Sequence, residues 1–561
     1  MSAEPVATAE PAQGATGLVE RLRQAIARHS SAPNPIWMRE MRQSARLTRT
    51  PFVLMSLTII ATMIIAGVGG SVMQTQRSDA VGQALFHTFF SLAFFVVAWA
   101  GPAVAANAIA SEREGRTWEA VVLTGMSPKT IARGKFLSAF TAIASYVVML
   151  APVGALCFLF GGVDFLEVLI GYVYLFALSA LFVAFGLAIS SKLATSRGAI
   201  MVTLLLSVPA SATIFGTFGP GLGQAVHGLW ERVPSGAPVW LPMAYVRGEL
   251  GVEYVLLLFV VPFVVIAVPA WFLYESTVAN LTEPTDDRSS GLKRWFIGTT
   301  LVLVLAALSA MIPLITGDQI LIALVADTTL LLLFVLFCVS VFMGEPLAPS
   351  RRVRYAWDRS NVGRVSRWLG PGMEPTFQLV LGATVIALAL VSVGGLVREM
   401  FLPRGSTSLR FDVFARFVSY FGGFTVFVIG LGAWLRARST NLFGQRIVFG
   451  VILGGLAIVP WIIALVLGIA LRGSDATLSF ACASPLFGFV LLDHSANGEV
   501  VAAGFVMSVI FAGTGFAALG SAFRRARGIV RAWEERQDQT DAAFAAEDAA
   551  LEAASRNAAS S

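Results

Sequence analysis

Long apolar stretches separated by short polar ones run through most of the chain. Twelve of these stretches are close to or above the roughly 20 residues that a helix needs to cross a bilayer. They predict twelve membrane-spanning helices. The predicted spans cover residues 51–73, 83–107, 136–160, 165–190, 198–218, 252–274, 295–316, 320–343, 377–397, 413–435, 447–471 and 500–522.

The composition agrees with a protein that is embedded in a membrane. Of the 561 residues, 56% are hydrophobic and only 13% are charged, whereas about a quarter of the residues of a soluble domain are charged. So few charges cannot cover a water-facing surface of this size, and much of the surface must therefore face lipid. The expected fold is an all-α, polytopic bundle of about twelve spans.

Basic residues are distributed unevenly between the two sides of this predicted bundle. With a cytosolic N-terminus, 32 of the 40 Lys and Arg residues fall in cytosolic segments and 8 fall on the other side. Such a bias is typical of cytosolic loops, and it predicts that both termini are cytosolic in the cell (inner) membrane. We interpret the net charge of +6 as a sign of orientation and of contact with anionic membrane lipid, not of nucleic-acid binding.

Polar stretches divide the chain into five segments. Residues 1–33 are rich in Ala, Glu, Pro, Gln and Ser and predict a disordered cytosolic lead-in. The other predicted segments are a six-span domain at 34–275, a cytosolic linker at 276–294, a second six-span bundle at 295–522 and a cytosolic tail at 523–561. The second bundle is either a degenerate repeat of the first or an accessory bundle.

A short amphipathic segment precedes the first span. Asn34 is a favourable N-cap and Pro35 suits the first helical position, so a helix is expected over residues 34–50. Trp37 and Met41 lie four apart on its apolar face. Its charged residues are Arg39, Glu40, Arg42, Arg46 and Arg49. The pattern predicts a helix in the membrane interface, and the alternative is an ordinary basic flank of the first span.

A second short segment lies between the second and third predicted spans. Ser111 and Glu114 can form a capping box, and Gly125 can end a helix in the left-handed conformation. A helix is therefore expected over residues 111–125, and a Ser-Pro pair then begins the next one. A short helix with both charge signs at the bilayer surface suits the docking of a partner, and the alternative is a solvated connector.

This second segment resembles the signature of ATP-binding-cassette (ABC) type-2 permeases. The resemblance is carried by the run Glu-Arg-Glu-Gly-Arg-Thr-Trp-Glu at 112–119, by Leu-Thr-Gly-Met-Ser-Pro at 123–128, and by a Gly-Lys pair before the third span. The segment 34–42 resembles the entry helix of the same family. The first six spans, about residues 34–275, fit the family's fold.

The resemblance implies that the segment after the second span is a coupling helix, which docks on a separate cytosolic ATPase. The docking residues that it implies are Glu112, Arg113, Glu114, Gly115, Arg116, Thr117, Trp118, Glu119 and Val122. In that family Gly is commonest at the position of Arg116, and an aliphatic residue is commonest at the position of Trp118. The chain departs from the pattern at both positions. The chain is then expected to be the permease subunit of an ABC exporter, working as a homodimer or with a second permease.

The second six spans resemble this family less. Their cytosolic loop at 344–375 occupies the equivalent place but lacks the acidic signature, and six arginines lie between residues 351 and 367. We interpret these arginines as ligands of lipid phosphates. A second ATPase-docking site is the alternative.

Motifs for catalysis, cofactors and metals are absent from the sequence. No Gly-x-x-x-x-Gly-Lys-Ser/Thr run occurs, so the chain is not expected to be an enzyme, and ATP and Mg²⁺ are expected on the partner. Three cysteines and four histidines lie far apart, without metal-ligand spacing. Asp327 falls inside the eighth predicted span and is a possible intramembrane polar site. Two other hypotheses therefore remain: an ion- or proton-coupled carrier, and a membrane scaffold that does not transport.

Overall fold

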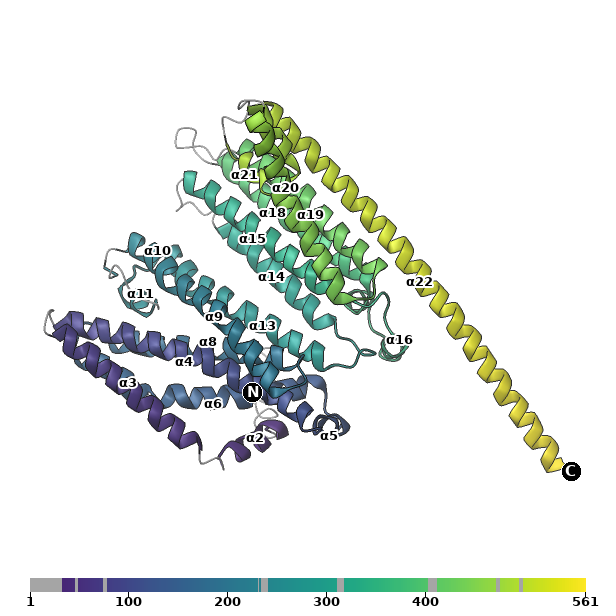
Figure 1. Ribbon diagram of the computed structural model, residues 1–561, viewed down its shortest axis with the longest axis horizontal. Helices are drawn as coiled ribbons and strands as arrows, with labels where there is room; N and C mark the ends of the chain where they lie inside the picture. Colours follow the sequence, from purple (N-terminus) through teal and green to yellow (C-terminus); the bar gives the residue numbers. More distant parts are fainter. Residues whose placement is uncertain are drawn as a thin grey trace, which may run out of the picture. The chain divides into compact units, whose positions relative to one another are not determined.

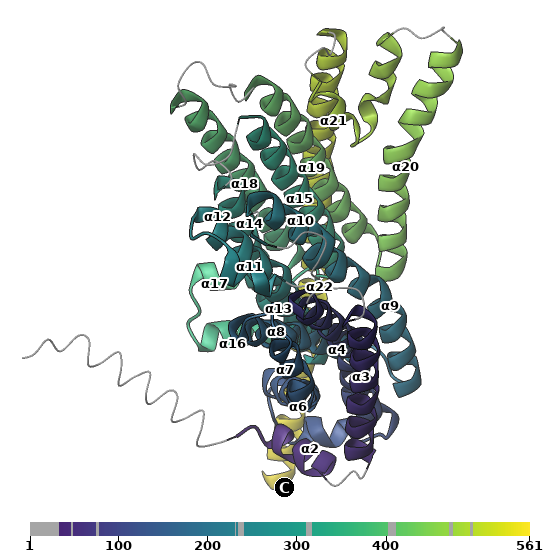
Figure 2. The same ribbon diagram turned by 90° about the vertical axis from the view of Figure 1, so that its left-hand side faces the viewer.

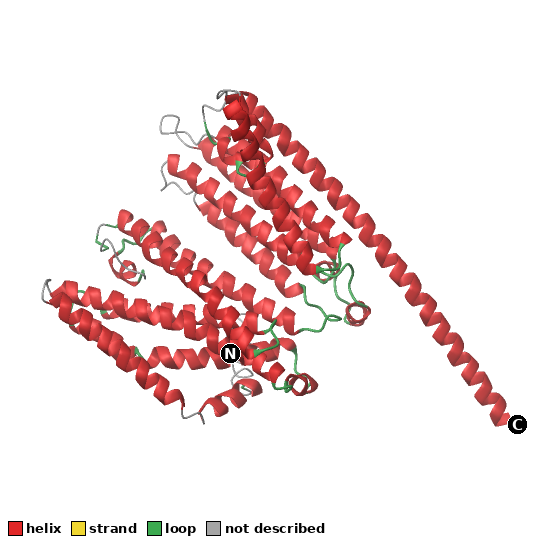
Figure 3. Cartoon of the chain, viewed as in Figure 1, coloured by secondary structure: helices red, strands yellow, loops and turns green. Residues whose placement is uncertain are grey.

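The computed structural model describes residues 33–45, 49–73, 78–230, 232–233, 241–309, 317–401, 411–470, 475–493 and 498–560. Within these residues all regular structure is helical and there is no strand (Figure 3). The expected all-α fold is therefore confirmed. The lead-in predicted for residues 1–33 lies, apart from Pro33, outside the described residues.

The number of spanning helices also agrees with the hydropathy pattern. Among the described residues, 11 helices are long and apolar enough to cross a membrane. A shorter apolar helix, Thr58–Met73, belongs to the 25-residue helix Arg49–Met73, which stands where the first span is predicted. The chain is thus a multi-pass α-helical membrane protein.

The chain divides into two compact units, Met1–Thr282 and Glu283–Ser561. The division falls inside the polar stretch 276–294. The last helix of unit 1 ends at Leu281, and the first helix of unit 2 begins at Ser290. Each unit contains its own set of spanning helices.

Unit 1 is a bundle of long helices with short helices at both ends. Its helices are α2 (Pro35–Ala45), α3 (Arg49–Met73), α4 (Ser78–Glu114), α5 (Trp118–Leu123), α6 (Pro128–Met149), α7 (Ala151–Leu159), α8 (Phe165–Ser190), α9 (Ser196–Gly216), the π-helical turn η1 (Thr217–Gly221), α10 (Leu222–Leu229), α11 (Pro242–Arg247), α12 (Val252–Val255), the π-helical turn η2 (Leu256–Val260) and α13 (Val261–Leu281). Within this unit, α2 and α5 lie at the end opposite to α10 and α11 (Figure 1).

The 37-residue helix α4 forms the centre of unit 1 and packs against α3, α6, α8 and α9. Phe86, Phe90 and Phe94 repeat every four residues along it and are buried in the largest apolar core. Gly186 of α8 meets the backbone of Pro102 so closely that an added Cβ would lie 2.2 Å from the Pro102 carbonyl oxygen. Only glycine permits this approach of the two helices.

An ion pair fastens the short helix α11 to the start of α8. Glu167 is fully buried, and Nε of Arg247 donates to its Oε1 at 2.8 Å. Arg247 also donates to the carbonyl oxygen of Gly162 at 2.8 Å. The other carboxylate oxygen of Glu167 accepts the backbone N–H of Asp164 at 3.0 Å, which satisfies a free donor at the helix start. These bonds close the end of unit 1 that lies away from α2.

Unit 2 is a second helical bundle. Its helices are α14 (Ser290–Ser309), α15 (Gly317–Phe342), α16 (Arg351–Arg359), α17 (Arg364–Trp368), α18 (Met373–Phe401), α19 (Phe411–Arg438), α20 (Leu442–Ala470), the 3-10 helix η3 (Asp475–Ala483), α21 (Phe487–Val490) and α22 (Gly498–Ser560). Its most extensive packing joins α19 to α22. In contrast, α20 stands at the edge of the unit (Figure 2), and only 11% of the apolar stretch of this helix is buried inside the protein.

The helix α22 continues without a break from the last predicted span through the predicted tail and extends past the other helices of its unit (Figure 1). Three of its residues, spaced seven apart on one face, form ion pairs with the rest of unit 2: Arg527 with Glu374, Glu534 with Arg354, and Asp541 with Arg351. Four of the six arginines interpreted as lipid ligands thus have acidic partners within the chain, because Arg352 also pairs with Glu283 and Asp286, and Arg367 pairs with Asp358. Exposed pairs of this kind each contribute little stability.

Candidate functional site

The candidate site includes the contact between α2 and the start of α6. The Oδ1 atom of Asn34 accepts the backbone N–H of Ile36 at 3.0 Å, as predicted for an N-cap, and its Nδ2 donates to the Thr130 carbonyl oxygen at 2.8 Å. Gly134 faces this contact, and an added Cβ would lie 2.5 Å from Asn34 Oδ1. The glycine of the Gly-Lys pair therefore allows α2 to lie directly on α6.

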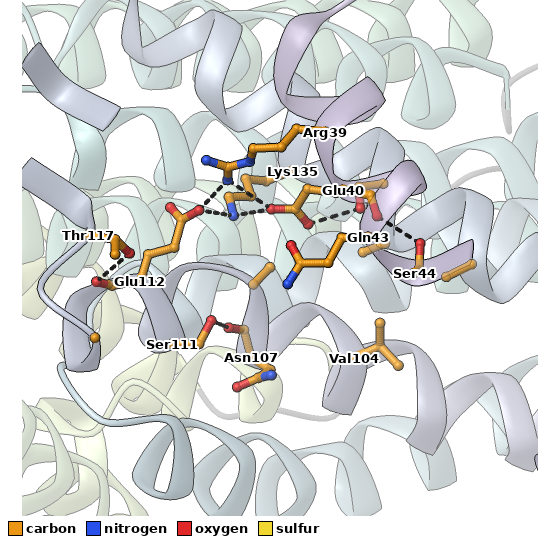
Figure 4. A pocket seen from close by; sticks show the side chains of 15 residues that line it. Arg39, Glu40, Gln43, Ser44, Val104, Asn107, Ser111, Glu112, Thr117 and Lys135 are labelled. Atoms are coloured by element: carbon orange, nitrogen blue, oxygen red, sulfur yellow. Dashed lines mark hydrogen bonds and ion pairs between the residues drawn. The ribbon is translucent and has the colours of Figure 1, made fainter. Parts of the chain in front are cut away.

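A buried lysine forms the centre of the site (Figure 4). Lys135 of α6 is 1% exposed, and its Nζ donates to Oε1 of Glu112 at 2.8 Å and to Oε1 of Glu40. Arg39 donates to the same Glu112 oxygen. We call these four residues the Lys135 cluster. It joins α2, the end of α4 and the start of α6, which come from separate parts of the sequence.

The Lys135 cluster carries two positive and two negative charges, Lys135 and Arg39 against Glu40 and Glu112. Burying a single charge is costly unless it is paired and hydrogen-bonded. Ser138 adds a hydrogen bond to Oε2 of Glu40 at 3.1 Å. Removal of one partner from such a buried network typically costs about 3–5 kcal/mol, so the cluster holds the three helices in one arrangement.

The capping box predicted for Ser111 and Glu114 is wrong. Helix α4 continues through both residues to Glu114, and the Ser111 hydroxyl donates back to the Asn107 carbonyl oxygen at 2.6 Å, as it can inside a helix. The Glu114 carboxylate instead accepts the backbone N–H of Ser196 at the start of α9, at 2.9 Å. The single helix predicted over 111–125 is therefore two elements, the last turn of α4 and the separate helix α5.

Two left-handed residues set α5 apart from the spanning helices. Arg116 has φ +55°, and Gly125 has φ +71°. Gly115 and Thr117 complete the turn, in which the Thr117 N–H donates to the Glu112 carbonyl oxygen at 2.9 Å. The chain thus leaves α4, makes six helical residues at the end of the bundle, and turns again before α6.

The inner face of α5 is anchored by a small apolar cluster. Val121 is buried with Ile36 of α2 and Ile131 of α6, and Trp118 packs beside them. The guanidinium of Arg113 lies 5.6 Å from the centre of the Trp118 ring, a favourable cation–π arrangement. These contacts attach α5 to the same helices that the Lys135 cluster joins.

The outer face of α5 is exposed and partly apolar. Leu123 is 86% exposed and Val122 is 41% exposed. Glu119 and Ala120 are exposed beside them. Because Leu123 was not among the predicted docking residues, the structure adds it to the candidate surface, whereas Glu112 and Glu114 are occupied by contacts inside unit 1.

The predicted interfacial helix corresponds to α2, which ends at Ala45; residues 46–48 of that prediction lie outside the described residues. Arg42 is exposed and Met41 is partly buried. Trp37 was predicted to face lipid, but its Nε1 donates to the Thr141 hydroxyl of α6 at 3.3 Å. Ile36 of this helix is buried, a position that the amphipathic pattern does not predict.

Asp327 is a partly buried residue of α15. Its side chain makes no hydrogen bond or ion pair with any other residue that the structure describes. The adjacent Thr329 hydroxyl bonds to the Val325 carbonyl oxygen of its own helix at 2.7 Å. Asp327 belongs to unit 2, whereas α5 belongs to unit 1.

Comparison with known proteins adds no relative: no family model, no curated protein and no solved structure matches the chain. The fold and the site therefore define its class on physical grounds alone. It is a multi-pass α-helical membrane protein whose first unit carries a short, anchored helix with a partly apolar outer face between two spans.

Proposed function

We propose that this chain is the permease subunit of an ABC-type exporter, which couples ATP hydrolysis on a separate cytosolic ATPase to the movement of a substrate. The observation that carries the proposal is the exposure of Leu123 at the tip of α5, 86%. Isolated exposed apolar side chains are common, but this one stands beside Val122 on a helix whose other face is anchored. That combination suits docking on a partner protein.

The attachment of α5 supports a role in transmitting movement. Its inner face contacts Ile36 of α2 and Ile131 of α6, and both helices are joined to α4 by the Lys135 cluster. A displacement of α5 by a partner therefore acts on three helices together rather than on one flexible loop. Movement of packed elements as bodies is a common mechanism of switching between conformations.

The distribution of basic residues supports a cytosolic position for α5. In the predicted topology, the segment between the second and third spans is on the same side as both termini, where most Lys and Arg residues lie. A cytosolic ATPase is then within reach of α5. Because cassette ATPases act as pairs, we propose a second permease unit in the complex, supplied by a homodimer or by a different chain.

The proposal is tested by identifying the proteins that co-purify with this chain, among which a cassette ATPase is expected. Leu123→Asp and Glu119→Lys alter the outer face of α5 without touching the Lys135 cluster, and each is expected to reduce the amount of ATPase retained. Leu250→Asp is the matched control, because Leu250 is 88% exposed and lies in the loop after α11, at the other end of unit 1 (Figure 1). Full retention by both α5 variants would refute docking through this helix.

A further inference from the structure

A cavity of about 650 Å³ lies between α2, α4 and α6, beside the Lys135 cluster (Figure 4). One end is charged and is formed by this cluster. The apolar lining residues are Val104, Ala108, Ala139 and Ala142. Lys135 and Ala142 are seven residues apart on α6, so the two ends are separated by about 10 Å along the helix. The cavity therefore has a charged end and an apolar end. The distance between them matches a small polar headgroup followed by the start of an acyl chain.

The charged end suits a ligand that carries both signs. The Lys135 cluster has equal numbers of positive and negative groups, so a ligand of net negative or positive charge gains no net attraction from it. The amide side chains of Gln43 and Asn107 line the cavity beside the cluster (Figure 4). They can donate or accept hydrogen bonds.

Two groups of the cluster retain hydrogen-bonding capacity. Oε2 of Glu112 is buried and accepts no hydrogen bond from any residue that the structure describes, a costly state for a carboxylate oxygen. The side chain of Arg39 is 50% exposed, and both of its ion pairs use the Nη2 group. The rest of the guanidinium can donate to a phosphate oxygen, while the Glu112 oxygen requires an N–H donor.

Apolar surface is also present on α3. The described side chains in its first turns, Phe52, Met55 and Ile59, are exposed by 69%, 58% and 49%. Farther along α4, a second and wholly apolar cavity of about 140 Å³ lies between α3, α4 and the end of α6. An acyl chain that follows α4 from the first cavity meets apolar surface along its way.

We propose that this cavity binds one phospholipid whose headgroup contains a phosphate and a primary ammonium. The phosphate lies at Arg39, and the ammonium donates to the carboxylate of Glu112. One acyl chain passes Ala108 and Ala142. A quaternary ammonium has no N–H to donate, and an anionic headgroup has no cation for Glu112, so both fit this site less well. Lipid binding here does not require the ATPase.

Native mass spectrometry of the purified, delipidated full-length chain tests this proposal without a partner. The probes are phosphatidylethanolamine, phosphatidylcholine and phosphatidylglycerol with identical acyl chains, together with water-soluble glycerophosphoethanolamine. We expect one tightly retained phosphatidylethanolamine, with affinity about tenfold above the other two lipids, the effect of one hydrogen bond to a charged group. Equal retention of the three lipids, or equally tight binding of glycerophosphoethanolamine, would overturn the proposal.

A cavity-filling variant locates the bound lipid. Ala142→Phe fills the apolar end and leaves the Lys135 cluster intact, so we expect loss of the retained lipid with an unchanged melting temperature of the lipid-free chain. Ser145→Phe is the matched control, because Ser145 is exposed on the same helix and does not line the cavity. Retention of the lipid by Ala142→Phe, or its loss from Ser145→Phe, would contradict the assigned site.

A change of headgroup preference tests the role of Glu112. Glu112→Gln keeps the shape of the side chain but removes the negative charge, so phosphatidylethanolamine is expected to bind no better than phosphatidylcholine. An unchanged preference would remove Glu112 from the site. Should this variant fail to fold, the headgroup series of the wild-type chain and the Ala142→Phe variant still decide the proposal.

Discussion

The Nζ atom of Lys135 lies 2.8 Å from Oε1 of Glu112, although the two residues belong to different spanning helices. Glu112 is in the last turn of α4, and Lys135 is in the second turn of α6. The bond therefore holds together the two ends of the chain segment that contains α5. With Glu40 and Arg39 of α2 in the same cluster, α5 is supported by a network of charges around the buried Lys135 rather than by a loop.

We predict that Lys135→Ala strongly destabilises the protein. The substitution leaves the carboxylates of Glu40 and Glu112 close together with only Arg39 to neutralise them, so a loss of about 3–5 kcal/mol in the free energy of unfolding is expected. Denaturant titration of the purified chain in detergent measures this loss. Lys129→Ala is the control, since Lys129 is exposed in the first turn of the same helix. A loss below about 1 kcal/mol, the usual value for a surface pair, would contradict the importance given to the cluster.

The sequence was sufficient to predict the spans because twenty apolar residues have few alternatives to a membrane helix. It was not sufficient to predict that α4 continues through Glu112 to Glu114. Ser111 and Glu114 have the spacing of a capping box, but the same residues are equally compatible with one more turn of α4, and packing against α6 and α9 selects that turn. Local signals are commonly overridden by tertiary contacts in this way.

The partners of the buried lysine could not be found from spacing either. Lys135 was recognised only as half of a Gly-Lys pair, and its bonds to Glu112 and Glu40 span 23 and 95 residues. Leu123 was missed for a different reason. A leucine in an apolar run predicts burial, and only the turn at Gly125, with φ +71°, places this side chain in solvent.

A second prediction concerns the packing of α19 against α22 in unit 2. An added Cβ on Gly515 would lie 2.5 Å from the Val426 carbonyl oxygen, whereas Gly513 has no neighbouring atom within 4 Å. Gly515→Leu must therefore separate the two helices, and we expect a substantially lower melting temperature. Gly513→Leu, on the same helix, is expected to leave it nearly unchanged. Similar melting temperatures for the two variants would show that the helices do not approach as described.

A third prediction is a pH dependence of stability that arises from Glu345. Burial raises the pKa of this carboxyl above its ordinary value of 4.5, although Lys293 and a hydrogen bond from Ser289 act in the opposite direction. The folded chain then binds this proton more tightly than the unfolded chain does. The protonated Glu345 side chain therefore contributes stability that is fully present below about pH 4.5. This stability is lost as the pH rises through the pKa that Glu345 has in the folded chain.

Glu345→Gln is expected to remove this contribution, because glutamine has no proton to lose in this range. The measurement is the melting temperature of wild type and variant over the range of about pH 4.5 to 8. The wild-type value should fall more steeply as the pH rises. Parallel curves for the two proteins would contradict the assignment to Glu345.

A fourth prediction concerns Asp327, the intramembrane carboxylate of α15. Under the proposed function it is not part of an ion pathway, so Asp327→Asn should leave the ATP turnover of the reconstituted permease–ATPase complex unchanged. A carrier driven by protons or other ions would instead depend on such a group. Transport that continues without any ATPase and is abolished by Asp327→Asn would establish that alternative.

Site-specific photo-crosslinking tests whether the tip of α5 touches a nucleotide-hydrolysing partner. A photoreactive residue is placed at Leu123 or at Leu250, two exposed leucines at opposite ends of unit 1, and the adducts are identified by peptide sequencing. We expect an adduct with a cassette ATPase at position 123 and none at position 250. The absence of an ATPase adduct at 123, or its formation at 250, would refute docking through α5.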